Sequence, residues 1–128
     1  MKPIKSAKDV YDIVKGKFLN KDVEHCYALT VGLAGNPIAL HWVSFGSETA
    51  CVIPKKVIAR HAINDLASGV VLIHNHPSGD PTPSNADINE TKSLQEMLDV
   101  LDIKLLDHLI IGEKKVFAFS EDKGFKVK

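Results

Sequence analysis

The stretch VVLIHNHPSGDPTPSNAD, residues 70–87, runs from a short apolar segment through two histidines into a helical pattern. Its first part, Val70-Val71-Leu72-Ile73, has no polar interruption, which is typical of a strand that is buried on both faces of a sheet. Because side chains alternate along a strand, His74 and His76 are predicted to share one face. The prolines and the glycine that follow restrict the path of the connecting loop. This stretch therefore predicts a central strand with two histidines at its end.

An aspartate, Asp87, lies in the first turn of the helix that is predicted to begin near Ser84. Two imidazoles and a carboxylate are ligands that Zn²⁺ prefers, and three protein ligands leave a position for water, as in catalytic zinc sites. We therefore predict that His74, His76 and Asp87 bind Zn²⁺. A simpler interpretation also exists, because Ser84-x-x-Asp87 has the spacing of a helix capping box, which needs no metal. The joint occurrence of the histidines, the stiff loop and the acid favours the metal site.

The spacing of these residues is similar to that of a known family. His-x-His, seven residues, Ser, two residues and Asp is the pattern of the JAMM (MPN+) metallopeptidases, and HNHPSGDPTPS resembles their RadC branch. The similarity includes Pro54 with the helix after it, residues 105–108 and residues 119–120, and it extends from about Ile4 to Gly124. It implies a zinc-dependent hydrolase that cleaves a peptide or isopeptide amide in a protein or peptide substrate.

Apolar periodicity predicts the rest of the fold. The pattern alternates between strands and helices, and Gly69 is expected to end the second helix. This alternation predicts one α/β domain over residues 1–128, with a mixed sheet flanked by helices on both faces and Val70–Ile73 central in it. The resemblance implies the same three-layer JAMM (MPN) fold, which is similar to that of cytidine deaminases. Helices are predicted after Ser6, Pro54 and Ser84, and strands over Val23–Leu33, Ile38–Phe45, Val70–Ile73, Ile103–Ile111 and Val116–Phe119.

The resemblance also implies a general base. The JAMM pattern has a glutamate near the start of the first strand, and Glu24 matches it best, at the head of a row of small side chains. Glu48 is an alternative, because it also precedes the histidines and lies in a glycine-flanked loop. We predict that Glu24 accepts a proton from the attacking water and that Ser84 donates a hydrogen bond to the developing oxyanion.

The pair Asp107-His108 lies within the penultimate predicted strand. These side chains either orient a ligand imidazole or form an ordinary buried polar pair, and the sequence leaves both interpretations open. Other zinc enzymes are excluded, because the deaminase motifs His-x-Glu and Pro-Cys-x-x-Cys and the protease motif His-Glu-x-x-His do not occur.

Composition restricts the class of protein further. Among 128 residues, 16 basic and 16 acidic side chains cancel, which argues against strong nucleic-acid binding. No apolar run approaches the ~20 residues of a membrane span, and the first residues do not resemble a secretory signal. Cys26 and Cys51 are expected to be buried free thiols, although a disulfide between them stays open. These features predict a cytoplasmic protein.

A second function class remains beside the hydrolase. RadC proteins carry a DNA-repair name, so the domain is alternatively a non-catalytic, metal-stabilised binding module acting in DNA repair or recombination. Members of the family usually carry a helix-hairpin-helix segment ahead of this domain. That segment does not occur in this sequence, so we expect a separated catalytic-type domain or a short member of the family.

Overall fold

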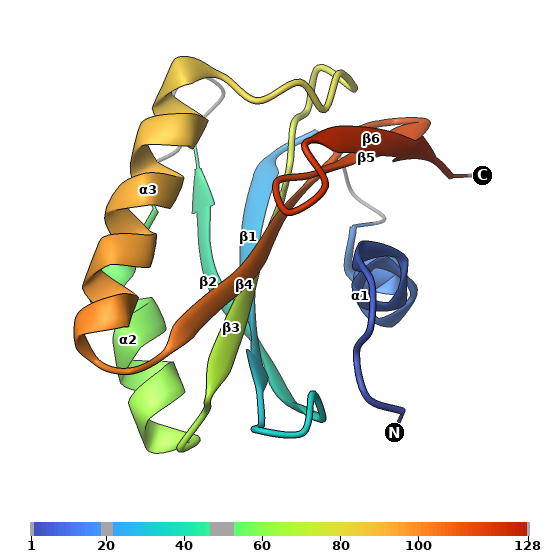
Figure 1. Cartoon of the computed structure of the whole chain (residues 1–128). Coiled ribbons are helices and arrows are strands. Elements are labelled where there is room, and N and C mark those ends of the chain that lie inside the picture. The colour runs from blue at the N-terminus through green and yellow to red at the C-terminus, as the bar shows by residue number, and fades with distance from the viewer. Residues whose placement is uncertain (1, 19–21, 47–52, 128) are drawn as a thin grey trace.

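The computed structural model describes residues 2–18, 22–46 and 53–127. Within these ranges the chain forms three α-helices, a short 3₁₀ helix and a mixed sheet of six strands (Figure 1). The strand order in the sheet is β2-β1-β3-β4-β5-β6. In chain order, the elements are α1 Ala7–Val14, η1 Lys15–Lys17, β1 Glu24–Val31, β2 Pro37–Gly46, α2 Lys55–Asn64, β3 Gly69–Asn75, α3 Asn85–Val100, β4 Lys104–Ile111, β5 Lys115–Ala118 and β6 Lys123–Lys126.

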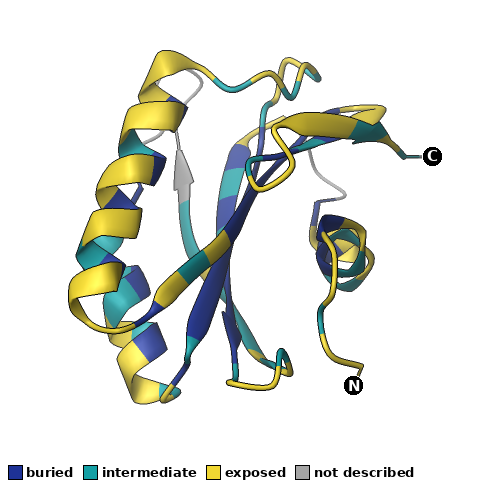
Figure 2. Cartoon of the chain, in the orientation of Figure 1, coloured by how far each residue is buried: buried dark blue, intermediate teal, exposed yellow. Residues whose placement is uncertain are grey.

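The sheet separates two helical layers (Figure 1). On one face, Val10 of α1 packs in a cluster that includes Val71. On the other face, Ile58 of α2 and Leu94 of α3 pack in a second cluster that includes Leu72. As a result, β3 is buried along its whole length, whereas the side of α3 that faces away from the sheet is exposed (Figure 2). The prediction of a three-layer α/β domain is confirmed.

The strand β3 has neighbours on both sides. It pairs antiparallel with β1 and parallel with β4, and every residue from Gly69 to Asn75 is buried. The uninterrupted apolar run is explained by this position, since each face of β3 meets a different hydrophobic cluster. The prediction that Val70–Ile73 is a central strand is therefore confirmed.

The helices begin at the signals that the sequence carries. Ser6 caps α1, with its side chain accepting a hydrogen bond from the backbone N–H of Asp9. Pro54 occupies the N-cap position of α2, where its missing N–H leaves no helical bond unmade. Ser84 caps α3, and this cap determines where the helix carrying Asp87 starts.

Two details differ from the sequence-based expectation. Gly69 does not end α2, because Leu66 takes a positive φ of 51° after the helix and Gly69 opens β3. A Cβ at Gly69 would lie 2.7 Å from Cδ1 of Leu106, so a larger residue there would require the half-exposed leucine side chain to move. The strand β6, Lys123–Lys126, was not predicted, because its short, lysine-rich sequence has little apolar pattern.

Two expectations from composition, on the cysteines and on membrane spans, can be compared with the structure. Cys26 is a buried free cysteine, whereas Cys51 lies outside the described residues. None of the helices in the described ranges has the length and apolar character that crossing a membrane requires.

Candidate metal centre

The candidate metal centre lies at one end of the sheet, where β1 starts, β3 ends and α3 begins (Figure 1). Glu24 is the first residue of β1, and His74 is the second last of β3. His76 directly follows β3, and Asp87 lies in the first turn of α3. Because β1 and β3 are antiparallel, with Cys26 opposite His74, the start of one strand lies beside the end of the other. The topology thus brings all the predicted metal ligands together with Glu24.

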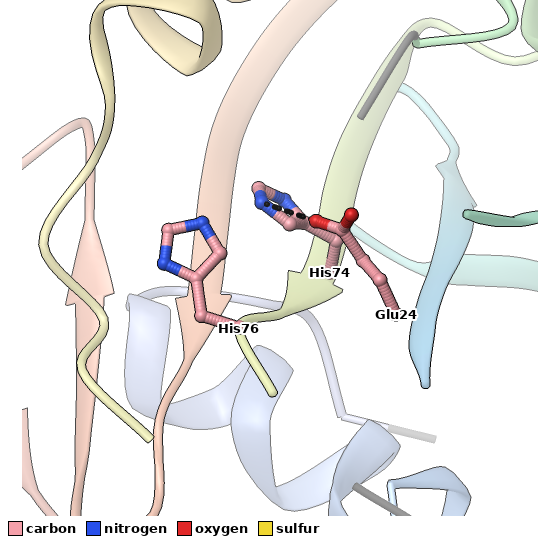
Figure 3. A group of neighbouring side chains, drawn as sticks. All are labelled: Glu24, His74 and His76. Carbon is pink, nitrogen blue, oxygen red and sulfur yellow. Dashed lines mark ion pairs between the residues drawn. The ribbon is translucent and has the colours of Figure 1, made fainter. Parts of the chain in front are cut away.

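The side chains converge on a small volume. Nε2 of His74 lies 3.4 Å from Oε1 of Glu24 and 3.4 Å from Oδ1 of Asp87, and Nε2 of His76 lies 3.0 Å from Oδ2 of Asp87. Figure 3 shows the Glu24 carboxylate directed at the His74 ring, with His76 alongside. Among the described residues, Glu24, His74 and His76 offer atoms that all lie within 4.8 Å of one another, a grouping that can hold a metal ion.

Exposure differs between the members of this group. The side chains of His74, Asp87 and Glu24 are 1%, 5% and 9% exposed, whereas that of His76 is 19% exposed. Solvent therefore reaches this group from the side of His76.

The outer nitrogen of His76 is held by a backbone group. Nδ1 of His76 lies 2.9 Å from the carbonyl oxygen of Asp80, in the loop before α3. Because a carbonyl only accepts, Nδ1 carries the hydrogen and donates it. Nε2 is then the nitrogen that faces Asp87, which is the orientation that a metal-binding imidazole needs.

The two ring nitrogens of His74 differ in their hydrogen bonding. Its Nδ1 lies 2.7 Å from Nε2 of His108, so its other ring nitrogen faces the site. Nε2 of His74 is buried and has no hydrogen-bond partner within the part of the chain that the structure describes. A buried polar atom without a partner is costly, and a cation beside it would satisfy its lone pair. The residues present therefore fit a metal ion.

The charges of the site also suit a cation. Burial alone would raise the pKa of the Asp87 carboxyl, but its interactions with His74, His76 and the Ser84 N–H outweigh burial and hold that pKa well below its usual range. The hydrogen bond with Asp87 raises the pKa of His76. Asp87 is consequently ionised at neutral pH, and an anionic carboxylate is a strong ligand for a divalent cation.

Asp87 serves the helix cap and the site at once. Its Oδ2 accepts the backbone N–H of Ser84 at 2.8 Å, and Oγ of Ser84 accepts the backbone N–H of Asp87 at 3.0 Å. Oδ1 is the oxygen that faces His74. Oδ2 serves the cap and also lies 3.0 Å from Nε2 of His76, whereas Oδ1 takes no part in the cap. Capping and metal binding are therefore compatible through Oδ1. The hydroxyl hydrogen of Ser84 is not used in the cap, since Oγ accepts there.

Of the two glutamates predicted as candidates for the general base, the structure describes only Glu24. The structure places Glu24 on the same face of the sheet as His74, with its carboxylate at the site. Glu48 lies outside the described residues. The prediction that Glu24 stands at the histidine pair is consistent with this geometry.

The pair Asp107-His108 is divided by the alternation of β4. His108 is fully buried and contacts His74, and burial lowers its pKa well below the ordinary value. Asp107 accepts hydrogen bonds from the backbone N–H groups of His108 and Ser120 and from the Ser120 hydroxyl. His108 thus belongs to the surroundings of the site, whereas Asp107 ties β4 to the segment after β5.

Two residues at the site carry no motif that sequence reasoning singled out. Thr91 lies one helical turn after Asp87, and its hydroxyl contacts both the Asp87 carbonyl oxygen and Nδ1 of His108. Asn75 lies between the histidines, and its side chain bonds to the backbone on either side of Glu24. Their only sequence signals are helical spacing from Asp87 and position between two histidines, and neither signal is specific.

The fold and the site together define a class of protein: an α/β domain with two histidines and a carboxylate grouped at the end of a central strand. A family model described as a RadC-like JAB domain matches residues 4–125. The chain therefore belongs to the RadC-like JAB domain family, as the sequence motif predicted.

Relatives from several bacteria are similar over nearly the whole chain. A UPF0758 protein of Chlorobaculum tepidum is 36% identical over 118 residues, which are 92% of this chain and 53% of that protein. UPF0758 proteins of Alkaliphilus oremlandii and Caldanaerobacter subterraneus are 38% and 35% identical, each over 122 residues. These matches cover 94% and 95% of this chain, and 52% of each relative. The chain thus spans about half the length of the curated relatives it matches.

Proposed function

We propose that this domain is a zinc-dependent hydrolase of the JAMM type that cleaves a peptide or isopeptide amide in a protein or peptide substrate. The observation that carries the proposal is Nε2 of His74, a buried nitrogen with no hydrogen-bond partner in the described ranges. It lies 3.4 Å from carboxylate oxygens of both Glu24 and Asp87. A neutral imidazole would present the lone pair of this nitrogen to two carboxylates, an arrangement that a bound cation would stabilise. His74, His76 and Asp87 would hold the zinc ion.

The remaining groups suit amide hydrolysis. A bound zinc ion supplies Lewis acidity and lowers the pKa of water toward ~7. Glu24 accepts the proton of the attacking water on its carboxylate and delivers it to the leaving nitrogen. Ser84 donates its free hydroxyl hydrogen to the oxyanion that develops on the carbonyl, a contact that is worth roughly 3–4 kcal/mol in comparable sites.

Metal content tests the site itself. Purified protein is expected to contain about one zinc ion per chain, and His76→Ala is expected to lose it because the site then has too few ligands. Zinc affinity should fall at acid pH, since the imidazoles must be neutral to bind the ion. Full retention of zinc by a His74→Ala, His76→Ala double variant, measured by elemental analysis, would remove the proposed site.

The role of Glu24 separates an enzyme from a metal-stabilised binding module. Glu24→Gln keeps the size of the side chain but loses the ability to accept a proton. Zinc content and melting temperature should stay near wild type, while hydrolysis of a panel of fluorogenic peptide and isopeptide amides falls by ~10²–10⁴-fold. Glu96→Gln, at an exposed position on α3, is the matched control and should hydrolyse the panel like wild type.

Three other results would point elsewhere. If wild-type protein carries zinc but hydrolyses no member of the panel, the binding module in DNA repair or recombination is favoured. If Glu24→Gln stays active and Glu48→Gln does not, the base is Glu48. Loss of zinc from Glu24→Gln would make Glu24 a ligand and not the base.

A further inference from the structure

We propose that Thr91 and His108 are positioning residues that determine which nitrogen of His74 faces the metal; the inference rests on the metal centre proposed above. Nδ1 of His74 lies 2.7 Å from Nε2 of His108. Nδ1 of His108 lies 2.6 Å from Oγ1 of Thr91, which lies 2.6 Å from the carbonyl oxygen of Asp87. A continuous chain of hydrogen bonds therefore joins the two ligands His74 and Asp87.

The direction of each hydrogen bond in this chain follows from its last member, a carbonyl oxygen that can only accept. The carbonyl oxygen of Asp87 carries no hydrogen, so the Thr91 hydroxyl donates to it. That hydroxyl has no second hydrogen, so Thr91 accepts from Nδ1–H of His108. Nε2 of a neutral His108 is then an acceptor and receives the Nδ1 hydrogen of His74. His74 is left with the lone pair of Nε2 directed into the site.

Burial keeps water from replacing any of these partners. His74, Thr91 and His108 are 1%, 9% and 0% exposed. The His108 ring also stacks on Phe119, with ring centroids 4.7 Å apart and an interplanar angle of 4°. A charged imidazole at a fully buried position is unfavourable, which supports the neutral form of His108. Packing and hydrogen bonding thus hold the ring in one orientation.

In this arrangement α3 affects two of the proposed metal ligands. Its first turn supplies Asp87 as a ligand, and Thr91, one turn later, orients the ligand from β3 through His108. In metal sites generally, the partner of a ligating imidazole sets its tautomer, and loss of that partner lowers metal affinity by about 10–100-fold. Thr91 is therefore expected to affect metal binding without touching the metal.

The first test is the tautomer of each histidine, read from long-range ¹H–¹⁵N NMR spectra of the purified protein before and after zinc removal. We expect the hydrogen of His108 on Nδ1, and Nδ1 of His74 protonated, in both states. A hydrogen on Nε2 of His108, or an unprotonated Nδ1 on His74 in either state, would overturn the inference. The spectra require no enzymatic activity.

The second test compares Thr91→Val with Thr91→Ser. Valine keeps the branched shape but has no hydroxyl, whereas serine keeps the hydroxyl. Competition with a chromophoric chelator should show Zn²⁺ affinity falling by about 10–100-fold in Thr91→Val and staying near wild type in Thr91→Ser. The visible spectrum of bound Co²⁺ should change in the valine variant alone.

Two outcomes of that comparison contradict the inference. Equal affinity in Thr91→Val and wild type would show that the hydroxyl does not act on His74. Equal weakening in the valine and serine variants would assign the effect to packing. A wild-type protein that binds no zinc would instead overturn the proposed function, and the tautomers would still be readable in that case.

Discussion

The side chain of Asn75 is hydrogen-bonded to the backbone on both sides of Glu24. Its Oδ1 accepts the N–H of His25 at 2.7 Å, and its Nδ2 donates to the carbonyl oxygen of Val23 at 3.1 Å. Asn75 itself is 1% exposed and ends β3 between the two histidines of the motif. The residue between the histidines therefore holds the segment that carries the proposed base.

Replacement of this residue should separate positioning of the base from metal binding. In Asn75→Ala, the groups that lose their bonds destabilise the fold by about 1–3 kcal/mol, measured by urea unfolding. Zinc content should remain near one per chain, because no ligand is touched. Hydrolysis should fall mainly through kcat, since displacement of a catalytic group by ~1 Å can cost ~10²-fold.

Asn64→Ala, at an exposed position at the end of α2, serves as the control and should leave kcat unchanged. Loss of zinc from Asn75→Ala would mean that Asn75 supports the ligands and not Glu24. An unchanged kcat would show that the segment is held in place by other contacts.

Ser84 and Asp87 should respond differently to substitution, although they share one capping box. Ser84→Ala removes the hydroxyl cap and should lower the free energy of unfolding by about 0.5–2 kcal/mol, with zinc still bound. Asp87→Asn keeps an oxygen that can accept the Ser84 N–H, but it loses the carboxylate charge that His74 and His76 stabilise, so the metal-free protein should also be less stable. The same variant loses the charge of a ligand and should bind zinc much more weakly.

Chemical unfolding with and without a chelator, together with zinc competition, checks both variants. If Ser84→Ala lost zinc and Asp87→Asn kept it, the proposed roles of Ser84 in the cap and Asp87 at the metal would be wrong. If Ser84 also donates to the oxyanion, Ser84→Ala lowers the rate of hydrolysis at unchanged zinc content.

The stability of the domain at low pH should depend on Asp65, which lies away from the metal centre. Oδ2 of Asp65 lies 2.7 Å from Nε2 of His41 and accepts the Thr30 hydroxyl at 2.7 Å. The hydrogen bond with His41, and then that with Thr30, hold the pKa of Asp65 below its ordinary value. A carboxylate with a lowered folded-state pKa stabilises the fold above its unfolded pKa of ~3.9, and this stabilisation is lost as pH falls through the folded value.

The difference in unfolding free energy between wild type and Asp65→Asn should thus be smaller at about pH 3 than at about pH 5, because the carboxylate becomes protonated as pH falls. Urea unfolding at a series of pH values from 3 to 7 measures it. A difference that does not vary with pH would show that the Asp65 carboxylate gains nothing from its partners.

Much of this protein is determined by the sequence alone. The central strand and the helix starts follow from patterns within a few residues, because apolar periodicity and capping are local properties of the chain. The group formed by His74, His76 and Asp87 is also local. It is carried by one strand end, one proline-rich loop and one capped helix, so spacing predicted their meeting.

The tertiary structure decided which distant residues join that group. Glu24 reaches the histidines because β1 runs antiparallel to β3, and this pairing has no signal in the spacing between them. His108 meets His74 because the parallel pairing of β3 with β4 and the packing of α3 against β4 fix their register. The hydrogen bonds of Asn75 depend on the pairing of β3 with β1, and the contact of Thr91 with His108 depends on the packing of α3 against β4. A local pattern specifies an element, but the side chains of different elements meet only once those elements are packed.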